Sequence, residues 1–172
     1  MPDLFSDRGA IISPCGRYRY NLWRVWDHDL PRVLWVMLNP STADAEMDDP
    51  TIRKCVGFAR RWGFGSIEVV NLFAWRCTDP RDLPGDESAN GPDRDRYWLE
   101  AAGRANLTVA GWGAHVSYGP TIGKAMSTFA DMDCLGFTAS GQPRHPLMLG
   151  YATDKVPLVR GGAIVEVPLG AA

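Results

Sequence analysis

The sequence predicts an α/β protein: a single three-layer α/β/α domain over residues 1–172, with a mainly parallel central sheet. Strand-like apolar runs alternate with helical patterns along the chain, and this alternation is typical of a parallel sheet covered by helices on both faces. The runs at 33–37 and 67–73 are largely apolar, as central strands buried on both faces are. A chain of 172 residues with 45% hydrophobic residues is long enough to bury one such core.

The first half of the chain predicts three strands and one helix. Residues 17–27 alternate charged and aromatic side chains with a period close to two, as a half-exposed strand does. Residues 32–38 and 67–73 are the two buried strands. Between them, Asp49 and Pro50 predict a helix start, because Asp caps free amides and Pro suits the first helical position. Gly63 and Gly65 are expected to end this helix.

The second half continues the alternation after a long polar loop. Residues 74–93 are rich in Gly and Pro, and a loop of this length is usually functional or mobile. The elements predicted beyond it are a helix at 93–106, a strand at 107–113, a helix at 120–132, a short strand at 134–138 and a hairpin-like end at 155–168.

Composition excludes several classes of protein. The net charge of −2 argues against a broadly basic coat, so any contact with nucleic acid must come from a local patch. The four cysteines form no C-x-x-C motif, and we expect reduced thiols and no metal site. No apolar run approaches ~18 residues, and the start lacks a signal-peptide pattern. We therefore expect a cytoplasmic monomer with no cofactor and no membrane contact.

The polar segments that follow the predicted strands indicate where a site would lie. Ligands of parallel α/β sheets bind beyond the carboxyl ends of the strands. Those ends carry "NPST", "FAWR", "GWGAH" and "ASGQPRHPL", which begin at residues 39, 73, 111 and 139. The sequence therefore predicts that four separate loops converge on one edge of the sheet.

These segments, in this order, resemble the motifs of the uracil-DNA glycosylase superfamily. "MLNPST" is similar to its first motif, "VVNLFAWR" to its second-strand segment, "LTVAGWGAHV" to a later strand end, and "RHPLML" to its His-Pro-Ser motif. The resemblance covers residues 33–149. More closely, the chain resembles DUF1643, a family of unknown function, and the shared motifs imply that this family is a distant branch of the glycosylase fold. The resemblance implies a uracil-DNA-glycosylase-like domain that hydrolyses the N-glycosidic bond of a flipped-out base.

Two residues match catalytic positions of the superfamily. Asn39 matches the residue that orients the attacking water; an amide can place water but is a poor base, so a slow enzyme is implied. Its alternative role is that of a turn residue at a strand end. His145 matches the histidine that donates a hydrogen bond to the base carbonyl, which a neutral imidazole can do through one N–H. The alternative is a loop histidine exposed to solvent.

Asn71 is the most informative residue, because it lies in a strand that is otherwise apolar. A buried amide without partners costs about 1–3 kcal/mol, so its side chain must bond either to neighbouring backbone or to a ligand. In the superfamily, an Asn of this strand pairs with the Watson–Crick edge of an extruded base, which is how such enzymes select bases.

The resemblance extends to other residues of the same segments. Those expected to contact the substrate are Met37, Leu38, Pro40, Ser41 and Arg76. Those expected to contact nucleic acid are Thr42, Gly111, Trp112, Gly113, Arg144 and Leu147. A basic helix face could also track phosphates or be merely solvated; it comprises Arg53, Lys54, Arg60 and Arg61. His28 and His115 are interpreted as structural or solvated.

Two departures from the superfamily pattern bear on the substrate. Met37 replaces the opening Gly of the first motif, and Leu147 replaces the Ser of His-Pro-Ser. The predicted function is that of a nucleobase-processing enzyme whose partner is DNA or a nucleotide. The alternatives are an enzyme for another base or a free nucleoside, and a non-catalytic nucleic-acid or nucleotide-binding domain. A hydrolase elbow and a phosphate-binding glycine loop are both missing from the sequence.

Overall fold

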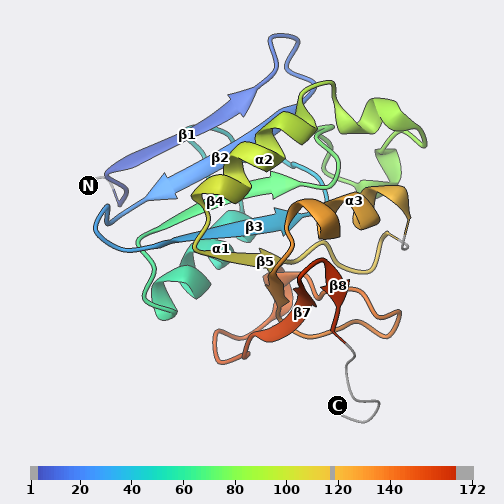
Figure 1. Ribbon diagram of the computed structural model, residues 1–172. Coiled ribbons are helices and arrows are strands. Elements are labelled where there is room, and N and C mark those ends of the chain that lie inside the picture. The colour runs from blue at the N-terminus through green and yellow to red at the C-terminus, as the bar shows by residue number, and fades with distance from the viewer. Residues whose placement is uncertain (1–3, 117–118, 166–172) are drawn as a thin grey trace.

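The computed structural model describes residues 4–116 and 119–165. These residues form one mixed sheet of eight strands in the order β1-β2-β4-β3-β5-β6-β7-β8 (Figure 1). The strands are β1 Asp7–Ile12, β2 Arg19–Val25, β3 Arg32–Met37, β4 Ser66–Asn71, β5 Leu107–Ala110, β6 Met132–Cys134, β7 Val156–Arg160 and β8 Ala163–Ile164. The helices are α1 Pro50–Arg61, α2 Arg94–Arg104, α3 Pro120–Thr128, and the short 3-10 turns η1 Pro80–Asp82, η2 Glu87–Asn90 and η3 Pro146–Met148.

The sheet is parallel only at its centre. β3 runs parallel to β4 and β5, and β5 runs parallel to β6. The pairs β1–β2, β2–β4, β6–β7 and β7–β8 are antiparallel. The prediction of a mainly parallel sheet is therefore wrong, since four of the seven pairings among the described strands are antiparallel. Both edges end in hairpins, which need only a short turn, whereas each parallel pairing requires a long crossover.

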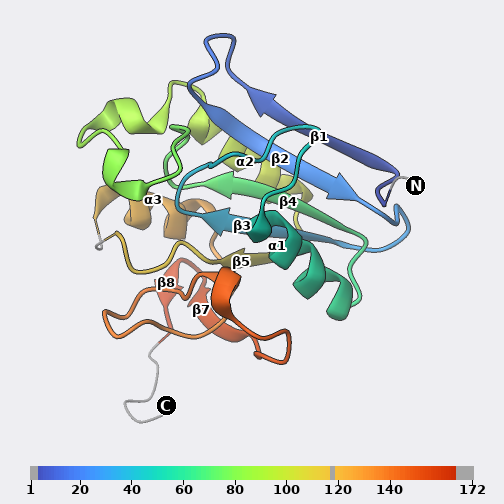
Figure 2. The same ribbon diagram turned by 180° about the vertical axis from the view of Figure 1, so that it is seen from behind.

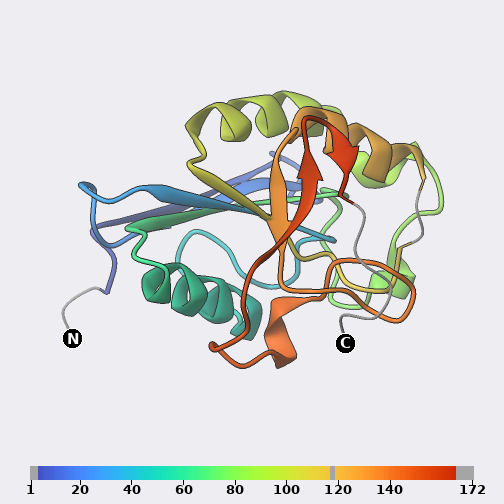
Figure 3. The ribbon, with the colours of Figure 1, turned by 60° about the horizontal axis from the view of Figure 1, so that its bottom comes forward.

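Helices cover the sheet on both faces, which gives three layers (Figures 2 and 3). A buried cluster that includes Trp98, Trp112 and Phe129 packs between the sheet and α2 and α3. A second cluster, with Trp35 and Phe58, fills the space between the sheet and α1. β3 contributes alternate side chains to both clusters, and this explains its continuous apolar sequence. None of the helices formed by the described residues is long and apolar enough to span a membrane.

Most predicted elements are present, with two differences. The strand predicted at 134–138 is wrong. The strand in this region is β6, which begins two residues earlier and ends at Cys134, and Gly136 takes a positive φ of 93° that does not continue a strand. β1 was not predicted at all; its Gly9 lies under the Trp23 ring, where a Cβ would come within 2.2 Å of a ring carbon. Residues 166–168 of the predicted C-terminal hairpin lie outside the described ranges.

A buried carboxylate ties β2, β3 and α2 together on the face opposite α1. Glu68 of β4 is 1% exposed and accepts hydrogen bonds from Asn21, Arg32 and Arg104. Burial opposes the charged form, but the hydrogen bonds from Arg104 and Asn21 outweigh it and lower the pKa of Glu68 below 4.5. The folded state therefore favours the ionised carboxylate more than the unfolded chain does.

The Glu68→Gln variant is expected to show this preference as a pH dependence. A lowered pKa in the folded state stabilises the protein above the unfolded pKa, and that stabilisation is lost as the pH falls through the folded value. The difference in free energy of unfolding between wild type and variant should be largest at neutral pH and shrink below about pH 4.5. Urea unfolding across this range measures it. The exposed Glu100→Gln is the control, and an equal pH dependence of the two variants would contradict the expectation.

Candidate functional site

A single cleft of about 660 Å³ lies at the carboxyl ends of the parallel strands. Its walls come from the loop after β3, the start of α1, the end of β4, the segment after β5, and η3 with the loop before it. Parallel strands end at the same edge of the sheet, so the loops that follow them meet there. Asn39, Asn71 and His145 all line this cleft.

Asn71 ends β4 and lies beside Met37 of β3 in the floor of the cleft. Its main-chain oxygen accepts a hydrogen bond from Nε1 of Trp98 at 3.0 Å. The residue is 4% exposed, and its side-chain amide forms no hydrogen bond within the described residues; it is not among the polar atoms sealed from solvent, so it can be reached from the cleft. The sequence allowed either backbone or a ligand as the partner of this amide, and the backbone does not supply one.

His145 is the N-cap residue of η3, and its ring is held by the turn that follows. Nδ1 accepts a hydrogen bond from the main-chain N–H of Leu147 at 3.2 Å. The neutral ring therefore carries its proton on Nε2, where it is a donor. Burial lowers the pKa of His145 below 6.5, against the opposing charge of Asp49, so the imidazole is neutral at pH 7.

Asn39 follows β3 and is anchored through its amide nitrogen. Nδ2 donates to the carbonyl oxygen of Cys77 at 2.8 Å and to that of Pro40 at 3.1 Å. These bonds link the loop after β3 to the loop after β4. They also leave Oδ1 as the free acceptor, because no described donor is bonded to it. Asn39 therefore has a turn role and an available carbonyl oxygen at the same time.

The other predicted site residues divide into two groups. Those that line the cleft are Met37, Leu38, Ser41, Thr42, Trp112, Gly113, Arg144 and Leu147. Pro40, Arg76 and Gly111 do not line it. Arg76 donates instead to the Gly16 carbonyl at 3.1 Å. Gly111 lies beneath the floor, where a Cβ would come within 3.0 Å of the Met37 sulfur.

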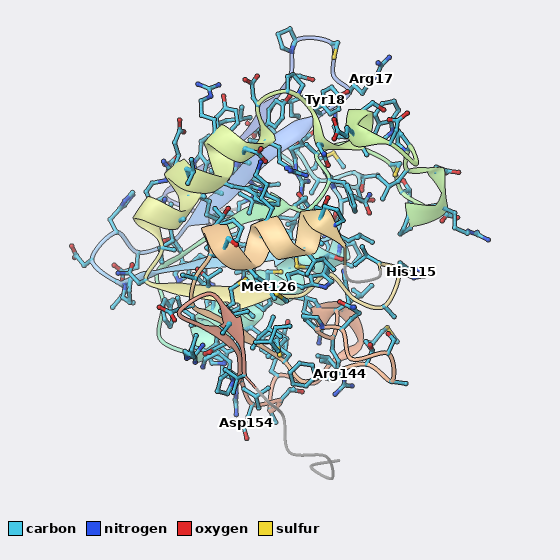
Figure 4. The ribbon with its side chains drawn as sticks, turned by 45° about the vertical axis from the view of Figure 1, so that its right-hand side comes forward. Arg17, Tyr18, His115, Met126, Arg144 and Asp154 are labelled. Carbon is cyan, nitrogen blue, oxygen red and sulfur yellow. The ribbon has the colours of Figure 1, made fainter. Side chains whose placement is uncertain are left out.

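On one side, the mouth of the cleft carries basic side chains. His115 lines it and is exposed, so its interpretation as structural or solvated omitted its place at the cleft. Arg144, also exposed, lies on the same side of the molecule (Figure 4). The basic face of α1 points elsewhere: Lys54 lies over the Tyr151 ring and Arg60 over the Trp26 ring.

Arg19 is a cleft residue that the sequence analysis missed. Its side chain is 3% exposed, and Nη1 donates to the Ala43 carbonyl at 2.8 Å. Nε has no hydrogen-bond partner, and no ion pair of Arg19 is formed within the described residues. Burial lowers the pKa of Arg19 to about 10, which leaves it charged at neutral pH.

A β-bulge explains why Arg19 reaches the cleft. Ile11 of β1 pairs with Asn21, but the next residue, Ile12, pairs with Arg19, so Tyr20 is extra. Tyr20 stacks on Tyr97 of α2 with ring centroids 5.1 Å apart, and Arg19 is turned to the α1 side. Regular alternation would have placed Arg19 on the face of Asn21. Two-residue periodicity carries no signal for such a bulge.

Asp49 is the second missed residue. It was predicted only as a helix cap, and its Oδ1 does accept the Ile52 N–H at 2.8 Å. It is also the one carboxylate among the described residues that line the cleft. Two of the charged residues of the cleft, Arg19 and Asp49, therefore come from positions that sequence patterns assigned to structure, whereas the third, Arg144, was predicted.

Comparison with known proteins identifies the family. A model described as "Protein of unknown function (DUF1643)" matches residues 19–147, which is most of the chain, and the chain belongs to this family. The matched residues carry the cleft from Arg19 to Leu147. No curated protein and no solved structure matches the chain.

Proposed function

We propose that this DUF1643 protein binds a nucleobase in the cleft and hydrolyses the N-glycosidic bond that joins the base to its sugar. The observation that carries the proposal is the Asn71 amide, which lines the cleft, forms no hydrogen bond within the described residues and remains accessible from the cleft. A ligand that replaces water on this amide gains about 0.5–1.5 kcal/mol for each hydrogen bond, and the amide has no competing partner in the described part of the protein.

An amide side chain suits a nucleobase because it presents a donor and an acceptor side by side. The Watson–Crick edge of a base carries the same kinds of group at the same spacing, and enzymes that act on extruded bases read that edge by hydrogen bonds. Asn71 would read the edge, and the Nε2–H of His145 would donate to a base carbonyl in the same cleft.

The proposed reaction uses three cleft residues. Oδ1 of Asn39 positions a water, whose oxygen forms a bond to the anomeric carbon of the sugar while the bond from that carbon to the base nitrogen breaks. The bonding electrons leave with the base, and His145 stabilises the negative charge that develops on it. Asp49 accepts the proton of the water, which supplies the base that an amide cannot be.

The likeness to the uracil-DNA glycosylase superfamily supports this reaction through four short segments only. Met37 lies in the cleft floor in place of the superfamily's glycine, and Leu147 lies at the wall in place of a serine. Both side chains make the cleft more apolar and smaller than those residues would. The proposal therefore includes the reaction class and leaves uracil as one of several candidate bases.

The test is release of free base, measured by chromatography after incubation with uracil, hypoxanthine and xanthine in both oligonucleotides and nucleosides. Wild type should release one base in preference to the others. In Asn71→Ala, the ratio between the release rate of the preferred base and that of the other bases should fall about tenfold or more, because a hydrogen bond to the base edge is removed. Asn106→Ala makes the same change outside the cleft and should behave as wild type. No release from any substrate would count against the proposal for these bases.

One observation favours a second candidate, binding of a nucleotide without turnover. The Asp49 carboxylate is already engaged as the cap of α1, so its presence in the cleft has a structural explanation as well. Under this alternative the protein binds the same ligands, and Asn71→Ala weakens binding, but no base is released.

A further inference from the structure

Arg19 differs from the other buried arginines in that its charge has no carboxylate partner within the described residues. Arg24 bonds to the Asp48 carboxylate at 2.7 Å, and Arg94 to that of Asp95 at 2.8 Å. Arg19 is equally buried, but no carboxylate of the described chain lies within ion-pairing distance. Its one hydrogen bond is to the Ala43 carbonyl, and Asp49 influences it only at longer range.

An unpaired buried cation is costly, and arginine is almost never fully buried without a partner. The Arg19 side chain lines the cleft, so a bound anion could supply that partner. Further donors lie in the same cleft: the hydroxyls of Ser41 and Thr42, and Thr51 in the first turn of α1, a helix of 12 residues. Arginine binds phosphate through several parallel hydrogen bonds.

We propose that Arg19 binds the phosphate monoester of a free mononucleotide whose base occupies the rest of the cleft. The assignment of the base end rests on the proposed function, whereas the phosphate end rests on Arg19 alone. Under this proposal the substrate is a small soluble nucleotide and not DNA.

The burial of Arg19 decides between these two substrates. A phosphate of duplex DNA is tied to sugars on both sides and lies at the surface of the double helix. It cannot reach a guanidinium that is 3% exposed in the floor of a cleft. A terminal phosphate monoester has one attachment and can enter. The basic face of α1, the other candidate for DNA phosphates, lies outside the cleft, and two of its four residues, Lys54 and Arg60, are engaged with Tyr151 and Trp26.

The width of the sheet fits a nucleotide lying across it. Arg19 lies on β2 and Asn71 on β4, while His145 contacts the segment after β5, where a Cβ on Gly113 would be 3.4 Å from its own Cβ. From β2 to β5 there are three strand spacings of about 4.8 Å, roughly 14 Å in all. The phosphate at Arg19 and the base carbonyl at His145 form the two ends of this span, and Asn71 lies between them, one strand spacing from β2.

The test compares the binding of nucleosides with that of their 5′-monophosphates by isothermal titration calorimetry. Inosine, uridine and xanthosine form the panel, with inorganic phosphate and a short single-stranded oligonucleotide as further ligands. The monophosphate of the preferred base should bind about 10- to 100-fold more tightly than its nucleoside, because charge-assisted hydrogen bonds to phosphate are gained. Arg19→Met should abolish this difference and leave nucleoside binding unchanged.

Arg19→Met also contains its own check on folding. It removes an unpaired buried charge, so its melting temperature without ligand should equal or exceed that of wild type. Loss of phosphate binding in this variant is then not a result of unfolding. The control is Arg61→Met, which removes an exposed arginine at the far end of α1 and should leave all the binding constants as they are.

The outcomes separate this proposal from the function proposed above. Equal affinity for nucleosides and monophosphates overturns the phosphate site and leaves base recognition standing. Binding of phosphate that depends on Arg19 but not on the base supports the phosphate site and counts against base recognition. An oligonucleotide that binds as tightly as the monophosphate, and equally depends on Arg19, overturns the free nucleotide. No binding of any of these ligands overturns both proposals.

Discussion

The Asp49→Asn variant is expected to release base about 10²- to 10⁴-fold more slowly than wild type, because a positioned general base typically contributes this factor. Asparagine is also among the best helix caps, so the hydrogen bond to the Ile52 N–H and the start of α1 should both persist. The rate constant for base release under single-turnover conditions is the quantity to compare.

Two comparisons make the Asp49 result interpretable. The melting temperature of Asp49→Asn should remain close to that of wild type, because the cap is conserved. Asn39→Ala removes an orienting acceptor but no base, and we expect a loss of about 10²-fold. If Asp49→Asn retains the wild-type rate while Asn39→Ala loses it, Asp49 is a cap and nothing more, and the amide alone places the water.

The Arg24→Met variant is expected to lower the free energy of unfolding by about 3–5 kcal/mol, the usual cost of removing one partner of a buried ion pair. Arg24 is 0% exposed and bonds to the Asp48 carboxylate and to the carbonyl oxygens of Gly9, Asp44 and Met47. Methionine fills a similar volume but removes the donor to the Asp48 carboxylate and to the Asp44 carbonyl, while the Met47 carbonyl keeps the Asp44 N–H at 3.1 Å. Chemical denaturation at neutral pH measures the difference.

Arg19→Met is the matched control for Arg24→Met, because both make the same change on β2 at an equally buried site. Arg24 differs from Arg19 in its ion pair to Asp48 and in its larger number of carbonyl acceptors. We therefore expect a large decrease in the free energy of unfolding for Arg24→Met and no decrease for Arg19→Met. Similar losses in the two variants would mean that buried volume, rather than the pairing of the charge, decides the stability of this strand.

The helices and the central strands were predictable from the sequence because each has a strong local pattern, whereas β1 and the position of β6 were not. The alternation of β3 residues between two cores produces a continuous apolar run, and the Asp49-Pro50 pair marks the start of α1. The order of the strands was not predictable. A short turn joins β2 to β3, and yet the two strands are not neighbours in the sheet. β4 lies between them and pairs with both. That choice depends on contacts between residues far apart in sequence.

The cleft was only partly predictable for the same reason. Asn39, Asn71 and His145 follow or end strands of the parallel centre, so the rule for carboxyl ends places them together. Arg19 lies at the beginning of an antiparallel strand, where this rule says nothing, and a bulge turns its side chain into the cleft. The position of the Arg76 side chain was not predictable, because its place after Trp75 does not show that it bends toward Gly16.

The two edges of the sheet govern how molecules meet at high concentration. An exposed edge strand with free N–H and C=O groups is a template for a strand of another molecule, and such contacts lead to aggregation. Here β8 is only two residues long, and β1 begins with Asp7 and Arg8 and has an irregular register at Ile12. Short length, charge and irregularity all disfavour the addition of a strand. The concentrated solutions that calorimetry requires should therefore remain clear.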